Sequence, residues 1–353
     1  MESKAFNKTV LLILGSLILI TTVFMVVIDP YFHYHTGLSG LGYPMQKEFY
    51  QNAGVARNYN YDILIAGDSE TQNIKTSKVE SLWGGTAVKL PNPGAPFNET
   101  DMVVRTALKK NPDLKLVIRP LDGYYIPTDP YTMRYAGSDL YLYDDNIFND
   151  VRYVLEKETI VDAITVLTYT RAGKSTISFD EYSNVEASEI YGNYDNLRIM
   201  LEETVDYGFG EPEEVIYERA KTNVCENIKK TALEYPDVEF IYFMPPYSAA
   251  YWKRLQNSGL TEVALNCERI ALEEIAGVGN IRVFSFEDRY EVTNDWHHYS
   301  DSIHFDGGVD DAMFELIYKG EHEIKAEDID DYILRLKDHY AGFDYDSLFL
   351  SED

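Results

Sequence analysis

Short apolar runs alternate with helix-like segments over residues 61–120, and this alternation is the strongest constraint on the fold. The runs are YDILIAG (61–67), TAVKLPN (86–92) and LKLVIRP (114–120), with helices expected between them at 70–82 and 98–109. Strands that alternate with helices form right-handed βαβ units and a parallel sheet. Two later runs, at 238–246 and 281–286, add two strands, with further helices expected at 213–233, 249–275 and 310–340. The sequence therefore predicts an α/β, flavodoxin-like three-layer sandwich around a five-stranded parallel sheet.

The first 28 residues predict a membrane anchor. Thr9–Ile28 contains no charged residue, and Lys4 and Lys8 precede it. At about 1.5 Å per residue, this run would cover the roughly 30 Å of a bilayer core. Lysines before the span and acidic residues after it favour a single-pass, N-in protein of the cell membrane with an extracytoplasmic domain. A cleaved signal peptide is the alternative, but the run is long for one and no A-x-A-like site follows it.

The composition excludes some partners and leaves the cysteines open. The chain has 353 residues, 45% of them hydrophobic, which is enough for a large core. It carries 59 acidic and 31 basic residues, a formal net charge of −28, so we expect no nucleic acid to bind. Cys225 and Cys267 could form a disulfide or remain two buried thiols, and the sequence favours neither.

The chain divides into segments of different character. We expect a cytoplasmic N-terminus at 1–8, the anchor at 9–28, a juxtamembrane segment at 29–60, one domain at 61–340 and a tail at 341–353. Within the domain the alternation stops at about 123–210, which predicts an insertion or cap. Its tyrosines could line a sugar-binding cleft, although ordinary packing explains them as well. They include Tyr124, Tyr125, Tyr131, Tyr135, Tyr141 and Tyr143.

Polar residues follow the ends of the strands, where ligands bind in open α/β sheets. Gly67-Asp68-Ser69 follows the first strand, and a serine at this place is either a helix cap or a nucleophile at a helix N-terminus. Near the other end of the chain, Asp301 stands three residues before His304. This spacing lets the carboxylate orient the imidazole while the other ring nitrogen faces a hydroxyl. Both groups are expected at the same edge of the sheet, which favours a nucleophilic Ser69.

These motifs, in this order, resemble those of the SGNH or GDSL hydrolase superfamily, and the resemblance extends from about residue 62 to residue 305. It implies that Ser69 is the nucleophile, His304 the general base and Asp301 the residue that holds His304. It also implies that the backbone N–H groups of Ser69 and Gly94 form part of the oxyanion hole, where donors stabilise the tetrahedral intermediate.

One position departs from the superfamily pattern. An asparagine usually follows the third strand as a further oxyanion donor, whereas Asp122 stands there in RPLDGYY. An ionised carboxylate cannot donate a hydrogen bond. Either another donor such as Asn98 replaces it, or the site serves a reaction other than ordinary ester hydrolysis, or activity is lost.

The anchor and this motif set together resemble accessory proteins of membrane-bound O-acyltransferase systems, such as the teichoic acid D-alanine transfer protein and the alginate acetylation proteins. The resemblance implies acyl transfer to a hydroxyl of a cell-surface glycan or teichoic acid, with a membrane-bound O-acyltransferase as partner. A deacylating esterase of the same polymer and a non-catalytic scaffold for the acyltransferase are the alternatives.

No metal or organic cofactor is expected. Asp295, His297 and His298 lie near His304 in sequence and could be interpreted as a metal cluster. Adjacent histidines project in different directions, however, and no second ligand group with zinc spacing appears.

Overall fold

The computed structural model describes residues 2–135, 137–205 and 210–351. The chain forms two compact units. The first comprises residues 1–59 and 135–178, and the second comprises residues 60–134 and 179–353. The middle of the segment expected as an insertion thus belongs to the same unit as the N-terminal segment.

The first unit is helical. Its helices are α1 (Glu2–Ile28), α2 (Glu48–Asn58), α5 (Val151–Leu155) and α6 (Lys157–Arg171), and a 3-10 turn spans Ser138–Tyr143. Among the described residues, only Lys4–Ile28 of α1 is a helix long and apolar enough to cross a membrane, as a signal anchor or a signal peptide would be. The Asp29 carboxylate follows α1 and accepts hydrogen bonds from the backbone N–H groups of His33, Tyr34 and His35 at 2.8 to 2.9 Å.

The second unit contains the predicted sheet. The strands are β1 (Ile63–Gly67), β2 (Ala87–Pro91), β3 (Leu116–Pro120), β4 (Glu239–Met244) and β5 (Ile281–Ser285). All neighbours pair in parallel in the order β2-β1-β3-β4-β5, which confirms the doubly wound sheet. The first three strands are buried along their whole length, and this burial explains why they appear in the sequence as nearly continuous apolar runs.

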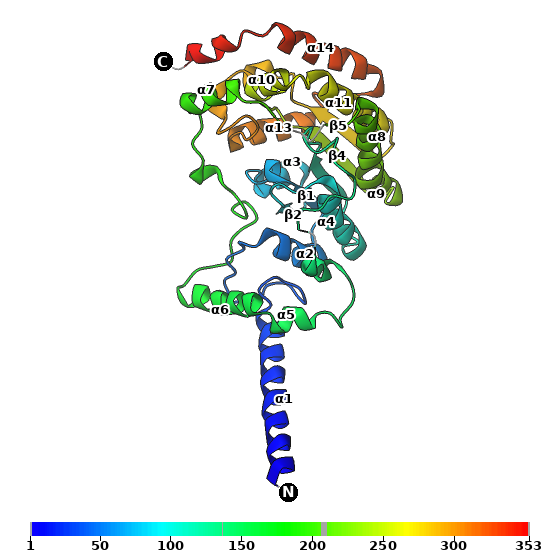
Figure 1. Ribbon diagram of the computed structural model, residues 1–353. Coiled ribbons are helices and arrows are strands. Elements are labelled where there is room, and N and C mark those ends of the chain that lie inside the picture. The colour runs from blue at the N-terminus through cyan, green and yellow to red at the C-terminus, as the bar shows by residue number, and fades with distance from the viewer. Residues whose placement is uncertain (1, 136, 206–209, 352–353) are drawn as a thin grey trace. The chain divides into compact units, whose positions relative to one another are not determined.

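Helices pack on both faces of the sheet, as right-handed crossovers in this strand order require (Figure 1). On one face α3 (Thr76–Trp83) contacts α13 (Gly307–Lys319). On the other face α8 (Glu213–Val224) contacts both α4 (Phe97–Lys110) and α11 (Thr261–Ile275). The other helices of this unit are α7 (Tyr194–Glu202), α9 (Lys230–Glu234), α10 (Ala249–Ser258), α12 (Tyr290–Thr293) and α14 (Ile329–Gly342).

Glycines divide two helices that the sequence analysis predicted as continuous. Gly259 separates α10 from α11, and Gly320 ends α13 well before α14 begins. Both glycines have a positive φ, +69° and +74°, in the left-handed conformation that commonly ends a helix. The single helices expected at 249–275 and 310–340 are therefore wrong in extent.

The cysteines and three of the tyrosines have structural surroundings. Cys225 and Cys267 are both free thiols, and Cys225 donates to Glu274 at 3.4 Å. In the first unit, the ring of Tyr135 stacks on Phe49 and the Tyr143 hydroxyl donates to the Phe49 carbonyl. Tyr141 is 4% exposed. These tyrosines pack within the first unit, whereas Tyr124, Tyr125 and Tyr131 belong to the second, so the six do not share one unit.

Candidate active site

Ser69 lies in a 3-10 turn (Ser69–Thr71) directly after β1, and the helix predicted at 70–82 begins only at Thr76, as α3. Asp68 caps this turn, because its side chain accepts a hydrogen bond from the backbone N–H of Glu70 at 3.0 Å. The helix-cap role considered for Ser69 thus belongs to Asp68. A Cβ atom at Gly67 would lie 2.5 Å from Pro120, so only glycine lets β1 end this close to β3.

A tight loop after β5 positions Asp301 and His304. One carboxylate oxygen of Asp301 accepts hydrogen bonds from the backbone N–H groups of Ile303 (2.9 Å) and His304 (2.8 Å), which is why a spacing of three residues closes this turn. The carbonyl of Ser302 accepts from the N–H and the hydroxyl of Ser248, at 3.1 and 2.9 Å. These bonds tie the loop to the segment that follows β4.

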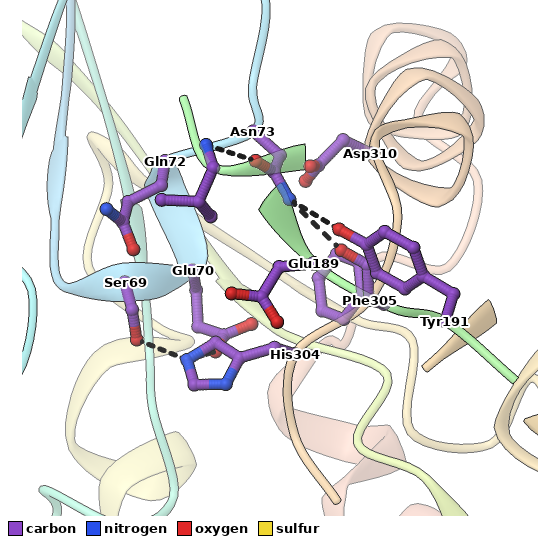
Figure 2. Close-up of a pocket in the computed structure, with 10 residues that line it drawn as sticks. Ser69, Glu70, Gln72, Asn73, Glu189, Tyr191, His304, Phe305 and Asp310 are labelled. Carbon is purple, nitrogen blue, oxygen red and sulfur yellow. Dashed lines mark hydrogen bonds and ion pairs between the residues drawn. The ribbon is translucent and has the colours of Figure 1, made fainter. Parts of the chain in front are cut away.

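Ser69, His304 and Asp301 form one chain of hydrogen bonds. The Ser69 hydroxyl lies 2.8 Å from Nε2 of His304, and Nδ1 of the same ring lies 2.7 Å from the second carboxylate oxygen of Asp301 (Figure 2 shows the first of these bonds). The His304 side chain is 36% exposed, so a substrate can approach it. The structure therefore brings together the three residues that the sequence analysis proposed as catalytic. This geometry is the one in which a base removes the proton of a serine hydroxyl.

The charges along this series of hydrogen bonds favour proton transfer to His304. Burial lowers the pKa of His304, but the hydrogen bond and the negative charge of Asp301 outweigh burial and raise that pKa above its usual value. Burial raises the pKa of Asp301, yet its hydrogen bond to His304 leaves that pKa below the usual range. Asp301 thus stays ionised beside the imidazolium that forms when His304 accepts a proton.

A cavity of about 110 Å³ opens beside Ser69 and His304. Its lining includes three carboxyl side chains, those of Glu70, Glu189 and Asp310 (Figure 2). Glu70 lies 3.9 Å from Nε2 of His304, and its buried Oε1 atom has no hydrogen-bond partner. Burial raises the pKa of Glu70 well above its usual value, and the negative charge of Asp68 raises it further.

The sequence analysis did not identify these acidic residues. Glu70 follows Ser69 directly, and this adjacency was the one available signal. Glu189 comes from an irregular segment without periodicity, and its neighbour Tyr191 accepts a hydrogen bond from Asn73 at 3.3 Å. Part of the cavity wall thus comes from a segment that no sequence pattern places in the fold.

Asp122 follows β3 and is buried beside Asp68, which follows β1. Asp122 accepts a hydrogen bond from the backbone N–H of Tyr124 at 2.7 Å, and the two carboxyl groups hydrogen-bond to each other. Burial raises the pKa of both groups, and the charge of Asp122 raises the pKa of Asp68 further. Two buried carboxyls in contact retain one proton between them, because both cannot be ionised at such a short separation. The hydrogen bond between them raises the pKa of Asp68 and lowers that of Asp122, so the shared proton favours Asp68 and Asp122 is the acceptor.

Gly94 and Asn98 lie on the loop after β2 and in the first turn of α4, at the same edge of the sheet. Gly94 has a φ of +73°, and a Cβ atom there would lie 2.3 Å from the guanidinium of Arg134. That guanidinium donates to the carbonyl of Pro93. The positive φ favours glycine at position 94, and a larger residue there would displace the Arg134 side chain, which places a positive charge over the loop. The sequence analysis did not single out Arg134.

The histidines near Asp295 are paired with carboxylates. Asp295 caps the 3-10 turn Trp296–His298 and lies 3.0 Å from Nδ1 of His297, while His298 lies 2.7 Å from Asp306. Among the described residues, no group of three or more histidine, cysteine or acidic side chains could hold a metal ion.

No protein-family model and no curated protein matches this chain. A solved structure described provisionally as a platelet activating factor from Streptococcus pneumoniae is similar to it, with 10% sequence identity and a TM-score of 0.37. The match covers 77% of this chain and 91% of that chain. A likeness this distant concerns the fold alone, so the function has to be inferred from the geometry of the site.

Proposed function

We propose that this chain is a single-pass membrane protein whose extracytoplasmic domain transfers an acyl group through Ser69. The acceptor would be a hydroxyl of a cell-envelope polysaccharide or teichoic acid, and a membrane-bound O-acyltransferase would supply the acyl group. The single observation that carries the proposal is the continuous hydrogen-bonded chain from Ser69 through His304 to Asp301, with spacings of 2.8 and 2.7 Å.

In the first half-reaction, the Ser69 oxygen attacks the carbonyl carbon of the acyl donor while its proton passes to Nε2 of His304. The tetrahedral intermediate then collapses, the bond to the leaving group breaks, and that group takes the proton from Nε2. The product is an ester between Ser69 and the acyl group. Asp301 holds the ring in the orientation that both transfers require.

In the second half-reaction, a hydroxyl of the polymer gives its proton to Nε2 of His304 and attacks the ester carbonyl. The Ser69 oxygen leaves and regains the proton. Water in place of the polymer hydroxyl would give hydrolysis with the same residues, so transfer requires an acceptor bound in the cleft. The catalytic residues therefore leave a deacylating esterase as the closest alternative activity.

The oxyanion of each intermediate needs hydrogen-bond donors. We assign this role to the backbone N–H groups of Ser69 and Gly94, with the Asn98 amide as a further donor. Asp122 accepts the proton of Asp68, so we do not assign it as a donor where the superfamily pattern has an asparagine.

The cavity beside Ser69 favours a short acyl group, because its volume is only about 110 Å³. Glu70, Glu189 and Asp310 contribute carboxyl groups to its lining. Burial raises the pKa of Glu70 and of Asp310 well above their usual values, so these two carboxyls tend to be neutral and can donate hydrogen bonds to a polar acyl group. We therefore expect a short, polar acyl group.

Labelling with a fluorophosphonate serine probe tests the proposal. The full-length protein in detergent should react, and Ser69→Ala and His304→Ala should abolish the reaction. Ser81→Ala and His297→Ala are matched controls, because both side chains are exposed and neither bonds to Ser69, His304 or Asp301. No reaction of the folded wild type, alone and with the acyltransferase, would reject a nucleophilic Ser69 and favour the scaffold. Product analysis with a glycan acceptor would then separate transfer from hydrolysis.

A further inference from the structure

The first unit carries a run of exposed apolar side chains on and before α5 and α6. We call it the apolar collar, and its members are 38 to 86% exposed. Such a surface is unusual in a chain with a net charge of −28. Large exposed apolar patches mark contact with a lipid or a protein. The collar consists of Ile147, Phe148, Val151, Leu155, Val161, Ile164 and Leu167.

Helix α6 shows the pattern most clearly, since it is apolar on two sides. Thr159, Ala163 and Val166 are buried in the unit, whereas Val161, Ile164 and Leu167 are exposed. The exposed stripe of a surface helix is normally polar. Lys157 and Arg171 are also exposed, and at 3.6 residues per turn they fall on this stripe at its two ends. A helix that buries one apolar side and exposes another needs a lipid or a protein to cover the exposed side.

The collar is held at the end of α1. Both α5 and α6 contact α1, and in Figure 1 α6 runs across α1 rather than along it. Near this end of α1, Met25 is fully buried and Ile28 is 7% exposed, whereas most of the preceding apolar helix is exposed.

Specific hydrogen bonds fix this arrangement. The Tyr153 hydroxyl of α5 donates to Asp29 at 2.5 Å, and the Tyr31 hydroxyl donates to Asp162 of α6 at 2.5 Å. The position of the collar along α1 is therefore set by the fold of the first unit.

We infer that the apolar collar lies in the outer interface of the membrane that α1 crosses, with a lipid surface as its partner. If α1 spans the bilayer, helices held at its far end lie at the level of the headgroups, where apolar side chains enter the acyl region and basic ends meet anionic headgroups. This inference rests on the proposal that α1 is an uncleaved anchor. The collar would hold the first unit against the membrane and remove the rotational freedom that a single anchoring helix leaves.

The test uses the full-length protein reconstituted into vesicles of phosphatidylcholine and phosphatidylglycerol. A Cys225→Ala background leaves Cys267, which is buried, as the remaining native thiol. An environment-sensitive fluorophore is attached at Phe148→Cys or Ile164→Cys, and at Leu334→Cys as a control. Leu334 is another exposed apolar residue, on α14 of the second unit.

We expect blue-shifted emission from the labels at 148 and 164. Doxyl-labelled lipid should quench this emission, whereas iodide in the solvent should quench it only weakly. The label at 334 should show the reverse. Labels at 148 and 164 that respond like the one at 334 in anchored protein would overturn the inference, and a protein partner would then be the expected occupant of the collar. Release of the protein from vesicles by alkaline carbonate would instead overturn the anchor itself, and the collar inference with it.

Discussion

Replacing Glu287 by glutamine tests whether a fully buried carboxyl that follows β5 is held in its neutral form. Glu287 follows β5, is 2% exposed and accepts a hydrogen bond from the Tyr332 hydroxyl. Burial raises the pKa of Glu287 from 4.5 to about 8, with further contributions from the charges of Asp288 and Asp122. A pKa difference of this size between folded and unfolded chains corresponds to on the order of 5 kcal/mol.

The sign follows from which state binds the proton more tightly. Because the pKa of Glu287 is raised in the folded chain, its contribution to stability is fully present below about pH 4.5 and is lost as pH rises to about 8. The wild type should therefore unfold more easily at about pH 8.5 than at about pH 5. Glutamine can still accept the Tyr332 hydrogen bond and has no proton to lose. Glu287→Gln should thus be more stable than the wild type at the higher pH and nearly equal to it at the lower pH.

Urea unfolding of the full-length protein in detergent, followed by circular dichroism at both pH values, measures this difference. Glu273→Gln on the exposed side of α11 is the matched control for the loss of one carboxyl group from the chain. Parallel pH dependences for the wild type and Glu287→Gln would refute the reasoning, because they would show that Glu287 titrates alike in the folded and unfolded chains.

Three further predictions concern the reaction. The hydrogen bond and charge of Asp301 outweigh burial and raise the pKa of His304, so the acidic limb of kcat/KM should lie above the pKa of about 6.5 of a free imidazole. Asp301→Asn should lower kcat by about 10⁴-fold and move that limb to lower pH. A limb that does not move would contradict this role of Asp301. Asn98→Ala should lose about 10²- to 10³-fold in kcat, because it removes the amide that we assign as an oxyanion donor, and unchanged steady-state kinetics would exclude a donor at this position. Gly94→Ala should lower kcat with little change in the melting temperature, since a Cβ atom there collides with Arg134 on an exposed loop; unchanged kinetics would remove Gly94 from the oxyanion site.

The sheet could be predicted from the sequence because its strands are buried on both faces. Burial of this kind forces nearly continuous apolar runs, and short helical segments between such runs leave few alternatives to a parallel sheet. Ser69, Asp301 and His304 could be selected for a related reason, since ligands bind at the carboxyl ends of parallel strands. The spacing of Asp301 and His304 carried the strongest local information, because a carboxylate three residues before a histidine can bond both its backbone N–H and its ring.

Other features depend on tertiary contacts that leave no periodic pattern. Glu189 reaches the cavity from an irregular segment, and α2 lies in a stretch expected only as a juxtamembrane connection. Asp122 appeared as a departure because the superfamily pattern has an asparagine there, and the sequence does not show that Asp122 is buried against Asp68. An acidic residue in a strongly acidic chain looks like a solvated surface group, and only the fold shows that Asp68, Glu70 and Asp122 are removed from water.

The buried carboxyls resolve a conflict in the electrostatics of the site. A base that accepts the Ser69 proton becomes positively charged, and nearby negative charge helps it to do so. Several fully ionised carboxyls, however, would hold the proton on His304 and leave no base for the next cycle. Because burial raises the pKa values of Asp68 and Glu70 well above their usual range, these two groups tend to keep protons, and Asp301 remains the principal charge that His304 faces. Loss of the protons on Asp68 and Glu70 would add negative charge near His304 and hold its proton more tightly. The burial of these carboxyls therefore keeps His304 available as a base for the next cycle.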